Sequence, residues 1–147
     1  MMTQSEAAAA ALAAKLHAGQ VDKAAKPYIE HLARVADILR MRYPDATPAE
    51  LEAAWLHDAL EDTSATAASL LAAGISEKAV EIIRQLTKPH GAVYLDWIVS
   101  LVRTGNVSAI RVKLADNEDN QNPDRVAMVP GADRMVETRY APARACF

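Results

Sequence analysis

The chain has 147 residues, of which 51% are hydrophobic and 24% charged, and its net charge is −3. This length allows one ordinary domain with a core of its own. The balance of hydrophobic and charged residues excludes a chain that is disordered throughout. The acidic balance also excludes the basic surface that nucleic-acid binding requires. The longest uncharged stretch, residues 63–76, is too short to span a membrane, so no membrane partner is expected. Cys146 is the only cysteine, which fits a cytoplasmic protein.

Alanine is the residue type that indicates the fold class most clearly. The chain has 31 alanines, 5 glycines and only 5% aromatic residues. Alanine is the best helix former and is depleted from strands, so the composition predicts an all-α protein. We expect one compact domain over residues 1–147, a bundle of about seven helices followed by an irregular segment after residue 120.

Hydrophobic periodicity and capping residues predict the helices in chain order. The expected segments are Glu6–Ala18, Pro27–Arg42, Pro48–Glu61, Thr66–Gly74, Glu77–Thr87, Ala92–Val102, Val107–Asp119 and, in the proline-rich tail, Asp133–Tyr140. The third segment has the clearest start, because Thr47 and Glu50 form a capping box around Pro48.

Several polar residues occupy positions that a helical core does not favour. His57 and Asp58 follow the apolar run 51–56, and Glu61 and Asp62 add two more carboxylates to the same helix end. Like charges this close repel one another, and their burial without partners costs several kcal/mol. A divalent cation resolves this conflict, and histidine nitrogen with carboxylate oxygen suits Mn²⁺, Fe²⁺ or Zn²⁺. Taken alone, the segment also allows a different interpretation, a solvated helix end.

Two further polar residues lie inside amphipathic helices, His31 in the second segment and Asp116 in the seventh. In chain order, His31, His57-Asp58 and Asp116 resemble the H…HD…D pattern of the HD superfamily of metal-dependent phosphohydrolases. The resemblance is closest to the hydrolase domain of the RelA/SpoT alarmone enzymes and to small stand-alone relatives. It covers about residues 5–120, and the matching stretches are residues 18–31, 54–63, 85–88 and 111–120.

The resemblance implies an HD-type helical fold and a role for each of these polar residues. The implied ligands of one divalent ion are His31, His57, Asp58 and Asp116. Mn²⁺ is the favoured ion, with Fe²⁺, Zn²⁺ and Mg²⁺ as alternatives. Glu61 and Asp62 would position and deprotonate the attacking water. Lys23 and Asn120 would contact the substrate.

The implied function is the hydrolysis of a phosphoester or pyrophosphate, with a nucleotide as the favoured substrate. Removal of the 3′-pyrophosphate of (p)ppGpp is the leading specific reaction, and a different nucleotide or a small phosphoester is an equal alternative. The alternative is a non-catalytic HD module that binds a nucleotide or a protein partner. The sequence leaves the oligomeric state open, including a homodimer.

Position 22 departs from the alarmone pattern. Alarmone hydrolases usually carry an arginine directly before the lysine that Lys23 matches, whereas this chain has Asp22. An aspartate neither stacks on a base nor attracts phosphate, so the sequence predicts inefficient alarmone hydrolysis that Asp22→Arg would improve. Nearby, Tyr28 is expected to pack beside His31. Lys113, one turn before Asp116, is expected to pair with a carboxylate.

Overall fold

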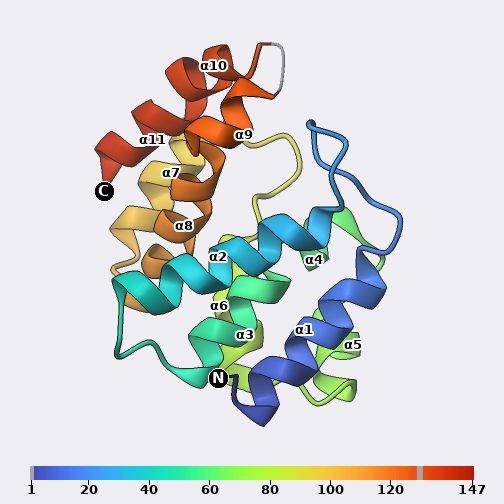
Figure 1. Cartoon of the computed structure of the whole chain (residues 1–147). Coiled ribbons are helices and arrows are strands. Elements are labelled where there is room, and N and C mark those ends of the chain that lie inside the picture. Colours follow the sequence, from blue (N-terminus) through green and yellow to red (C-terminus); the bar gives the residue numbers. More distant parts are fainter. Residues whose placement is uncertain (1, 129–130) are drawn as a thin grey trace.

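The computed structural model describes residues 2–128 and 131–147, and the regular elements of these residues are helices (Figure 1). This confirms the predicted all-α class. The elements are, in chain order, α1 (Gln4–Leu16), α2 (Tyr28–Arg42), α3 (Pro48–Leu56), α4 (Ala59–Asp62), α5 (Ala67–Ala72), α6 (Glu77–Leu86), α7 (Tyr94–Arg103), α8 (Val107–Asn120), α9 (Pro123–Ala127), α10 (Ala132–Met135), the π-helical η1 (Val136–Tyr140) and α11 (Ala141–Cys146).

Helix α3 lies at the centre of the core. It packs against α1, α2, α6 and α8, and its residues Glu50–Leu56 are all buried. A helix buried on all sides must be apolar all round or have its polar groups paired. Here Glu50 accepts hydrogen bonds from Ser108 Oγ at 2.6 Å and Arg111 Nη1 at 3.3 Å, and Glu52 accepts one from Ser76 Oγ at 2.9 Å.

The predicted start of α3 is confirmed. Thr47 Oγ1 accepts from the Glu50 N–H at 3.1 Å, and Glu50 Oε1 accepts from the Thr47 N–H at 3.2 Å. The short helix expected to end at Gly74 is α5, and Gly74 has a φ of +94°, which a residue with a side chain rarely adopts.

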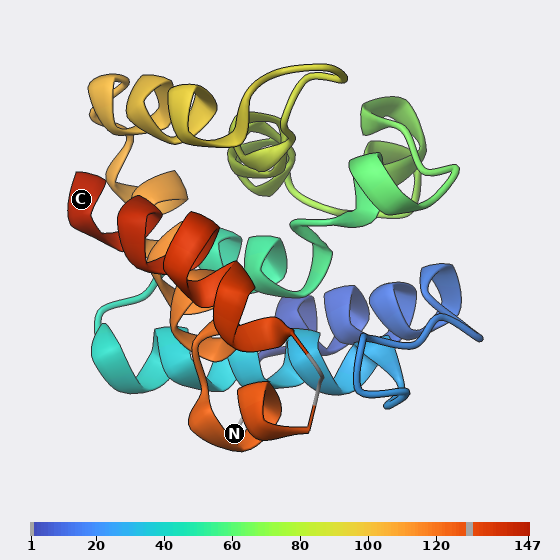
Figure 2. The same cartoon turned by 90° about the horizontal axis from the view of Figure 1, so that it is seen from above.

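Helices α2 and α8 lie side by side, and α3 packs against both (Figures 1 and 2). The buried face of α2 consists of His31, Leu32, Val35, Ala36 and Leu39, at the spacing that predicts one side of a helix. Helix α8 presents Asp116 to the same interior. As a result, a histidine on α2, the end of α3 and an aspartate on α8 converge.

The third helix is shorter than the sequence predicts. The expected segment Pro48–Glu61 divides into α3 and α4, because the backbone turns at His57 and Asp58. Asp58 has φ −99° and ψ 0°, the bridge conformation found in turns. The His57 side chain bonds to the Ala54 carbonyl oxygen at 2.8 Å, so it satisfies one of the carbonyls left over at the end of α3.

The tail after residue 120 is more regular than expected. Pro123 and Pro142 lie in the first turns of α9 and α11, where a missing N–H costs nothing. The expected helix Asp133–Tyr140 corresponds to α10 and η1. Helix α11 packs on α7 and α8, so the tail crosses the outer side of these two helices (Figure 2).

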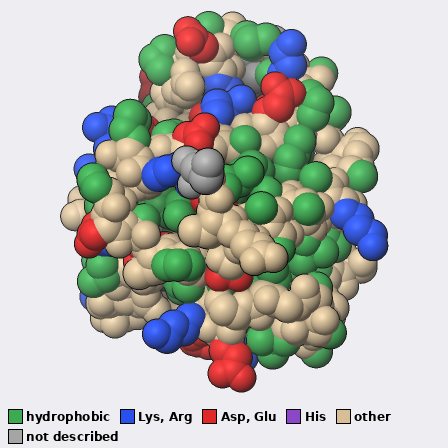
Figure 3. Space-filling view, turned by 60° about the horizontal axis from the view of Figure 1, so that its bottom comes forward, with side chains coloured by type: hydrophobic (Ala, Val, Ile, Leu, Met, Phe, Trp, Pro, Cys, Tyr) green, Lys and Arg blue, Asp and Glu red, His purple; other side chains and the backbone are tan. Residues whose placement is uncertain are grey.

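The surface carries charges of both signs, as the composition leads one to expect. On the face shown in Figure 3, acidic and basic side chains are interspersed with hydrophobic ones. Among the helices of the described residues, none combines the length and the apolar character that crossing a membrane requires.

Candidate metal centre and substrate cavity

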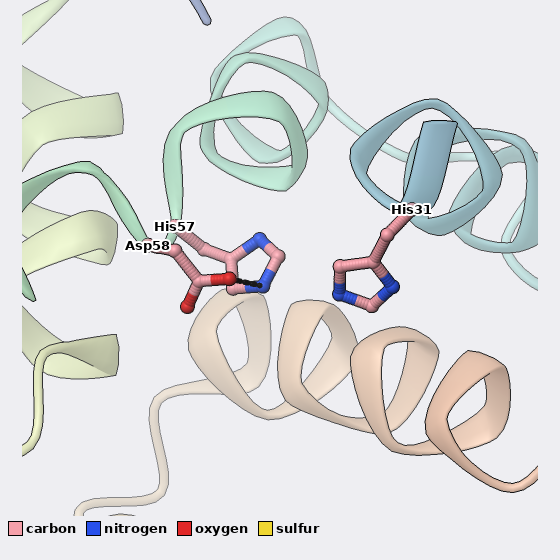
Figure 4. A group of neighbouring side chains, drawn as sticks. All are labelled: His31, His57 and Asp58. Atoms are coloured by element: carbon pink, nitrogen blue, oxygen red, sulfur yellow. Dashed lines mark ion pairs between the residues drawn. The ribbon is translucent and has the colours of Figure 1, made fainter. Parts of the chain in front are cut away.

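Three parts of the fold bring the four predicted metal ligands together. His31 comes from α2, and His57 and Asp58 come from the turn between α3 and α4 (Figure 4). Asp116 comes from α8. One ligand atom from each of His31, His57 and Asp58 lies within 4.8 Å of the others. Asp116 Oδ1 lies 3.0 Å from His31 Nε2 and 3.3 Å from His57 Nε2. Two imidazoles and two carboxylates therefore face one another.

The charges in this cluster balance each other. Burial lowers the pKa of His57, but the nearby charges of Asp58 and Asp116 outweigh it and raise that pKa well above its ordinary value. Burial raises the pKa of Asp58, but the neighbouring His57 outweighs it and brings that pKa to about 2. Each charge in the cluster therefore stabilises its neighbours of opposite sign. This donor set of nitrogen and carboxylate oxygen fits Mn²⁺ and similar ions.

Both imidazoles are oriented by a partner on the side away from the cluster. His57 Nδ1 lies 2.8 Å from the Ala54 carbonyl oxygen, and His31 Nδ1 lies 2.6 Å from Asp119 Oδ2. A carbonyl or carboxylate oxygen only accepts, so Nδ1 donates in both rings. Arg125 Nη1 also lies 3.0 Å from His31 Nδ1, but this guanidinium nitrogen has acceptors of its own in Asp119 Oδ2 and Asn120 Oδ1. Each Nε2 is therefore directed at the centre. Asp119 was not among the residues that the sequence singled out.

Two neighbours of the cluster behave as predicted, and one has an additional role. The Tyr28 ring packs beside the His31 ring, with 5.4 Å between centroids, and Lys113 Nζ donates to Asp116 Oδ2 at 2.9 Å. Burial raises the pKa of Asp116, but the Lys113 charge and the imidazoles hold it well below its ordinary value. The Tyr28 hydroxyl also donates to Asp58 Oδ2, a contact that the sequence does not indicate.

Glu61 and Asp62 lie at the end of α4, where both side chains are only partly exposed. Glu61 Oε1 accepts a hydrogen bond from the Lys88 backbone N–H, so this carboxylate is directed towards the turn after α6. Burial, with the charge of Asp58 added to it, raises the pKa of Asp62. Burial also raises the pKa of Glu61. The structure places both carboxylates beside the cluster and does not bring them into contact with the four predicted ligands.

A cavity of about 350 Å³ opens onto the cluster, a volume typical of small-molecule sites. His31, Asp58 and Asp116 form part of its wall, and both predicted substrate contacts, Lys23 and Asn120, line it. The other cationic lining residues are Lys113, Arg125 and Arg139, and the aromatic ones are Tyr28, Tyr94 and Tyr140.

The C-terminal part of the chain supplies a share of this lining that sequence analysis missed. Arg125 Nη1 lies 2.9 Å from Asn120 Oδ1 and 3.1 Å from Asp119 Oδ2. The Arg139 guanidinium lies 5.6 Å from the centre of the Tyr94 ring. No spacing pattern identifies these residues, because they reach the cavity only through the packing of the tail on α7 and α8.

The structure also changes the interpretation of Asp22. Its side chain is only 3% exposed and pairs with Arg125, with 3.5 Å between Oδ2 and Nε. Oδ1 accepts the N–H groups of Ala24 at 2.9 Å and Lys26 at 3.1 Å. The carboxylate is therefore neutralised inside its own loop, and the repulsion of phosphate expected from the sequence is offset by Arg125.

An all-α fold with a histidine and aspartate cluster beside a cationic cavity defines the class of metal-dependent phosphohydrolases. Residues 9–145 match the HD domain family, and the chain belongs to that family. The match includes the tail, beyond the stretch that the sequence motifs covered. A comparison with curated proteins found no match.

The fold is also found in a solved structure from an animal. The structure is of a metazoan ortholog of SpoT, described as hydrolysing ppGpp and playing a role in starvation responses. The TM-score is 0.74 at 20% sequence identity, with 100% of this chain and 96% of that chain covered. At this identity the similarity establishes the shared fold.

Proposed function

We propose that this chain hydrolyses a phosphoester or pyrophosphate of a nucleotide, with the 3′-pyrophosphate of (p)ppGpp as the leading candidate. The observation that carries the proposal is the position of the histidine and aspartate cluster in the wall of a cavity lined by four cationic side chains. Three aspartates, Asp22, Asp58 and Asp116, line the same cavity, so the four cations exceed the carboxylates by one. With a divalent ion bound, the excess of positive charge would attract a polyanion. The ppGpp hydrolysis described for the metazoan protein of the same fold supports the choice of candidate.

The proposed ligands of one divalent ion, Mn²⁺ by preference, are His31, His57, Asp58 and Asp116. Such an ion, when bound, offsets phosphate charge and makes water more acidic. Lys113 keeps Asp116 ionised, and the Tyr28 hydroxyl fixes one oxygen of Asp58.

Substrate binding is assigned to the cationic lining. Lys23 and Asn120 are the contacts that the sequence indicates, and Arg125 and Arg139 extend the positive lining on the side of the tail. The aromatic ring of Tyr140 offers a flat surface in the same cavity. A base would stack on this ring while the cationic side chains hold the phosphate groups.

Glu61 and Asp62 are proposed to position the attacking water and to accept its proton. Their raised pKa values, caused by burial together with the charge of Asp58, support this role. A carboxylate with a raised pKa is a better proton acceptor near neutral pH. We place the reaction in the cytoplasm and leave the oligomeric state open, a homodimer included.

A turnover screen tests the proposal. The purified chain, loaded with Mn²⁺, is incubated with guanosine tetraphosphate, with nucleoside mono-, di- and triphosphates and with p-nitrophenyl phosphate. We expect release of pyrophosphate or phosphate that requires Mn²⁺ and is lost in Asp58→Asn. Tight nucleotide binding without turnover of any substrate would contradict hydrolysis and favour the non-catalytic module.

A further inference from the structure

We propose that Asp119 is a positioning residue for the metal centre. Asp119 holds the His31 imidazole so that Nε2 of this ring is presented to the cation. This inference rests on the proposed metal site. It adds a residue that neither the H…HD…D pattern nor the family assignment indicates.

Asp119 has the geometry that this role requires. Its side chain is 0% exposed, and Oδ2 lies 2.6 Å from His31 Nδ1. On the other side of the ring, Nε2 lies 3.0 Å from Asp116 Oδ1. Because Asp116 and Asp119 are three residues apart on α8, they lie on the same helix face. The ring of His31 is therefore held between two carboxylates from one turn of α8.

The buried charge of Asp119 is compensated by two arginines. Arg34 Nε donates to Oδ1 at 2.8 Å, and Arg125 Nη1 donates to Oδ2 at 3.1 Å. A buried carboxylate without such partners would be costly, and it would be protonated in preference to staying charged. With both guanidinium groups in place, Asp119 stays an acceptor. Arg125 Nη1 lies 3.0 Å from His31 Nδ1 as well, but a guanidinium only donates, so the Nδ1 proton is accepted by Asp119 Oδ2 at 2.6 Å. Ligating histidines generally donate their second N–H to such an acceptor, which orients the ring and raises its basicity.

The two histidines of the cluster have different anchors, which provides an internal control. His57 Nδ1 is held by the backbone carbonyl of Ala54, which no side-chain substitution removes. His31 Nδ1 is held by the side chain of Asp119. A change at Asp119 should therefore affect one imidazole and leave the other in place.

The test compares Asp119→Asn with Glu118→Gln. Glu118 is the preceding residue on α8, and it pairs with Arg42 on the surface at 3.0 Å, so the control removes one acidic charge outside the centre. Calorimetric titration with Mn²⁺ measures affinity. We expect Asp119→Asn to bind Mn²⁺ about 10- to 100-fold more weakly than the unmutated chain, and Glu118→Gln to bind it equally well.

A second measurement detects the N–H proton of the His31 ring directly. In the Co²⁺-loaded chain, each coordinating imidazole should give a paramagnetically shifted N–H proton signal in NMR, one from His31 and one from His57. We expect the His31 signal to exchange slowly with solvent in the unmutated chain, because Asp119 is buried, and to broaden or vanish in Asp119→Asn. The His57 signal should persist in both. The measurement on the unmutated chain also covers the case in which Asp119→Asn does not fold.

The outcomes separate the two proposals. If the unmutated chain binds neither Mn²⁺ nor Co²⁺, the metal site is wrong and the role of Asp119 fails with it. If the unmutated chain binds the ions and Asp119→Asn binds them equally well, only the role of Asp119 is overturned. A fast-exchanging His31 N–H in the unmutated chain, or coordination through Nδ1, also overturns it.

Discussion

Asp22 and Arg125 form an ion pair that joins the loop before α2 to α9 at the wall of the cavity, with 3.5 Å between Oδ2 and Nε. The same Asp22 carboxylate caps its own loop through the N–H groups of Ala24 and Lys26. Its charge thus anchors a guanidinium that lines the cavity. Asp22, the residue that departs from the alarmone pattern, therefore helps to hold a cationic side chain in the wall of the cavity.

The first prediction is that Asp22→Arg weakens substrate binding, which is the opposite of the improvement expected from the sequence alone. Asp22→Arg would bring a second guanidinium against Arg125 and leave two backbone N–H groups without their acceptor. We expect KM for the nucleotide substrate to rise by about tenfold, which corresponds to ~1.4 kcal/mol. Steady-state kinetics with Mn²⁺ checks this.

Asp37→Arg is the control for charge reversal, because Asp37 is exposed on α2 and does not line the cavity. In the described residues its side chain bonds to Arg40, which is half-buried and also pairs with Glu6. The KM of Asp37→Arg should stay unchanged. If Asp22→Arg instead lowers KM, the ion pair with Arg125 does not organise the cavity and the expectation from sequence is restored.

The second prediction concerns metal content. His57→Ala or Asp58→Ala should abolish binding of the single divalent ion per chain, because each removes one donor from a buried cluster. Elemental analysis and Mn²⁺ titration measure this, and His90→Ala, at an exposed turn, should bind as the unmutated chain does. Retention of the ion in both cluster variants would show that the donor set is assigned wrongly.

The third prediction separates metal binding from chemistry. Glu61→Gln and Asp62→Asn should retain the ion, since both side chains lie outside the cluster, and should lose about 10²-fold or more in kcat if they act on the attacking water. Glu77→Gln, in the exposed first turn of α6, is the matched control. Full activity of both variants would show that a group other than Glu61 or Asp62 accepts the proton of the attacking water.

The fourth prediction is a pH dependence of opposite sign with and without metal. Burial lowers the pKa of His31 and of His57, but the neighbouring carboxylates outweigh it and raise both above 6.5. A group whose pKa is higher in the folded chain than in the unfolded chain stabilises the fold fully at pH values below its unfolded pKa. This stabilisation is lost as the pH rises through its folded pKa. The metal-free chain should therefore lose Tm as the pH rises above about 6.5.

Mn²⁺ competes with the same protons, so its affinity should rise across the same range. Thermal unfolding in EDTA and in excess Mn²⁺, between about pH 6 and 8, measures both trends. A Tm in EDTA that rises steadily over this interval would mean that the two imidazoles are neutral in the folded metal-free chain.

Much of the fold follows from local sequence signals. The alanine content, the periodicity of α2 and the capping box at Thr47 are properties of neighbouring residues, and the structure agrees with them. The end of α3 was predicted wrongly, because the turn at His57 depends on where its side chain bonds. The regularity of the tail was missed, since prolines in a first turn and prolines that end a helix look alike in sequence.

The sequence by itself determined the helical class, and it singled out His31, His57, Asp58 and Asp116 because their order resembles the H…HD…D pattern of the HD superfamily. Only the tertiary structure decided what surrounds them. Asp119 lies 88 residues from the imidazole that it contacts, and Arg125 lies 94 residues from it. Such pairs follow from the packing of α2, α8 and α9. Helical periodicity specifies which face of a helix is buried, but it carries no information on which distant side chain that face will meet.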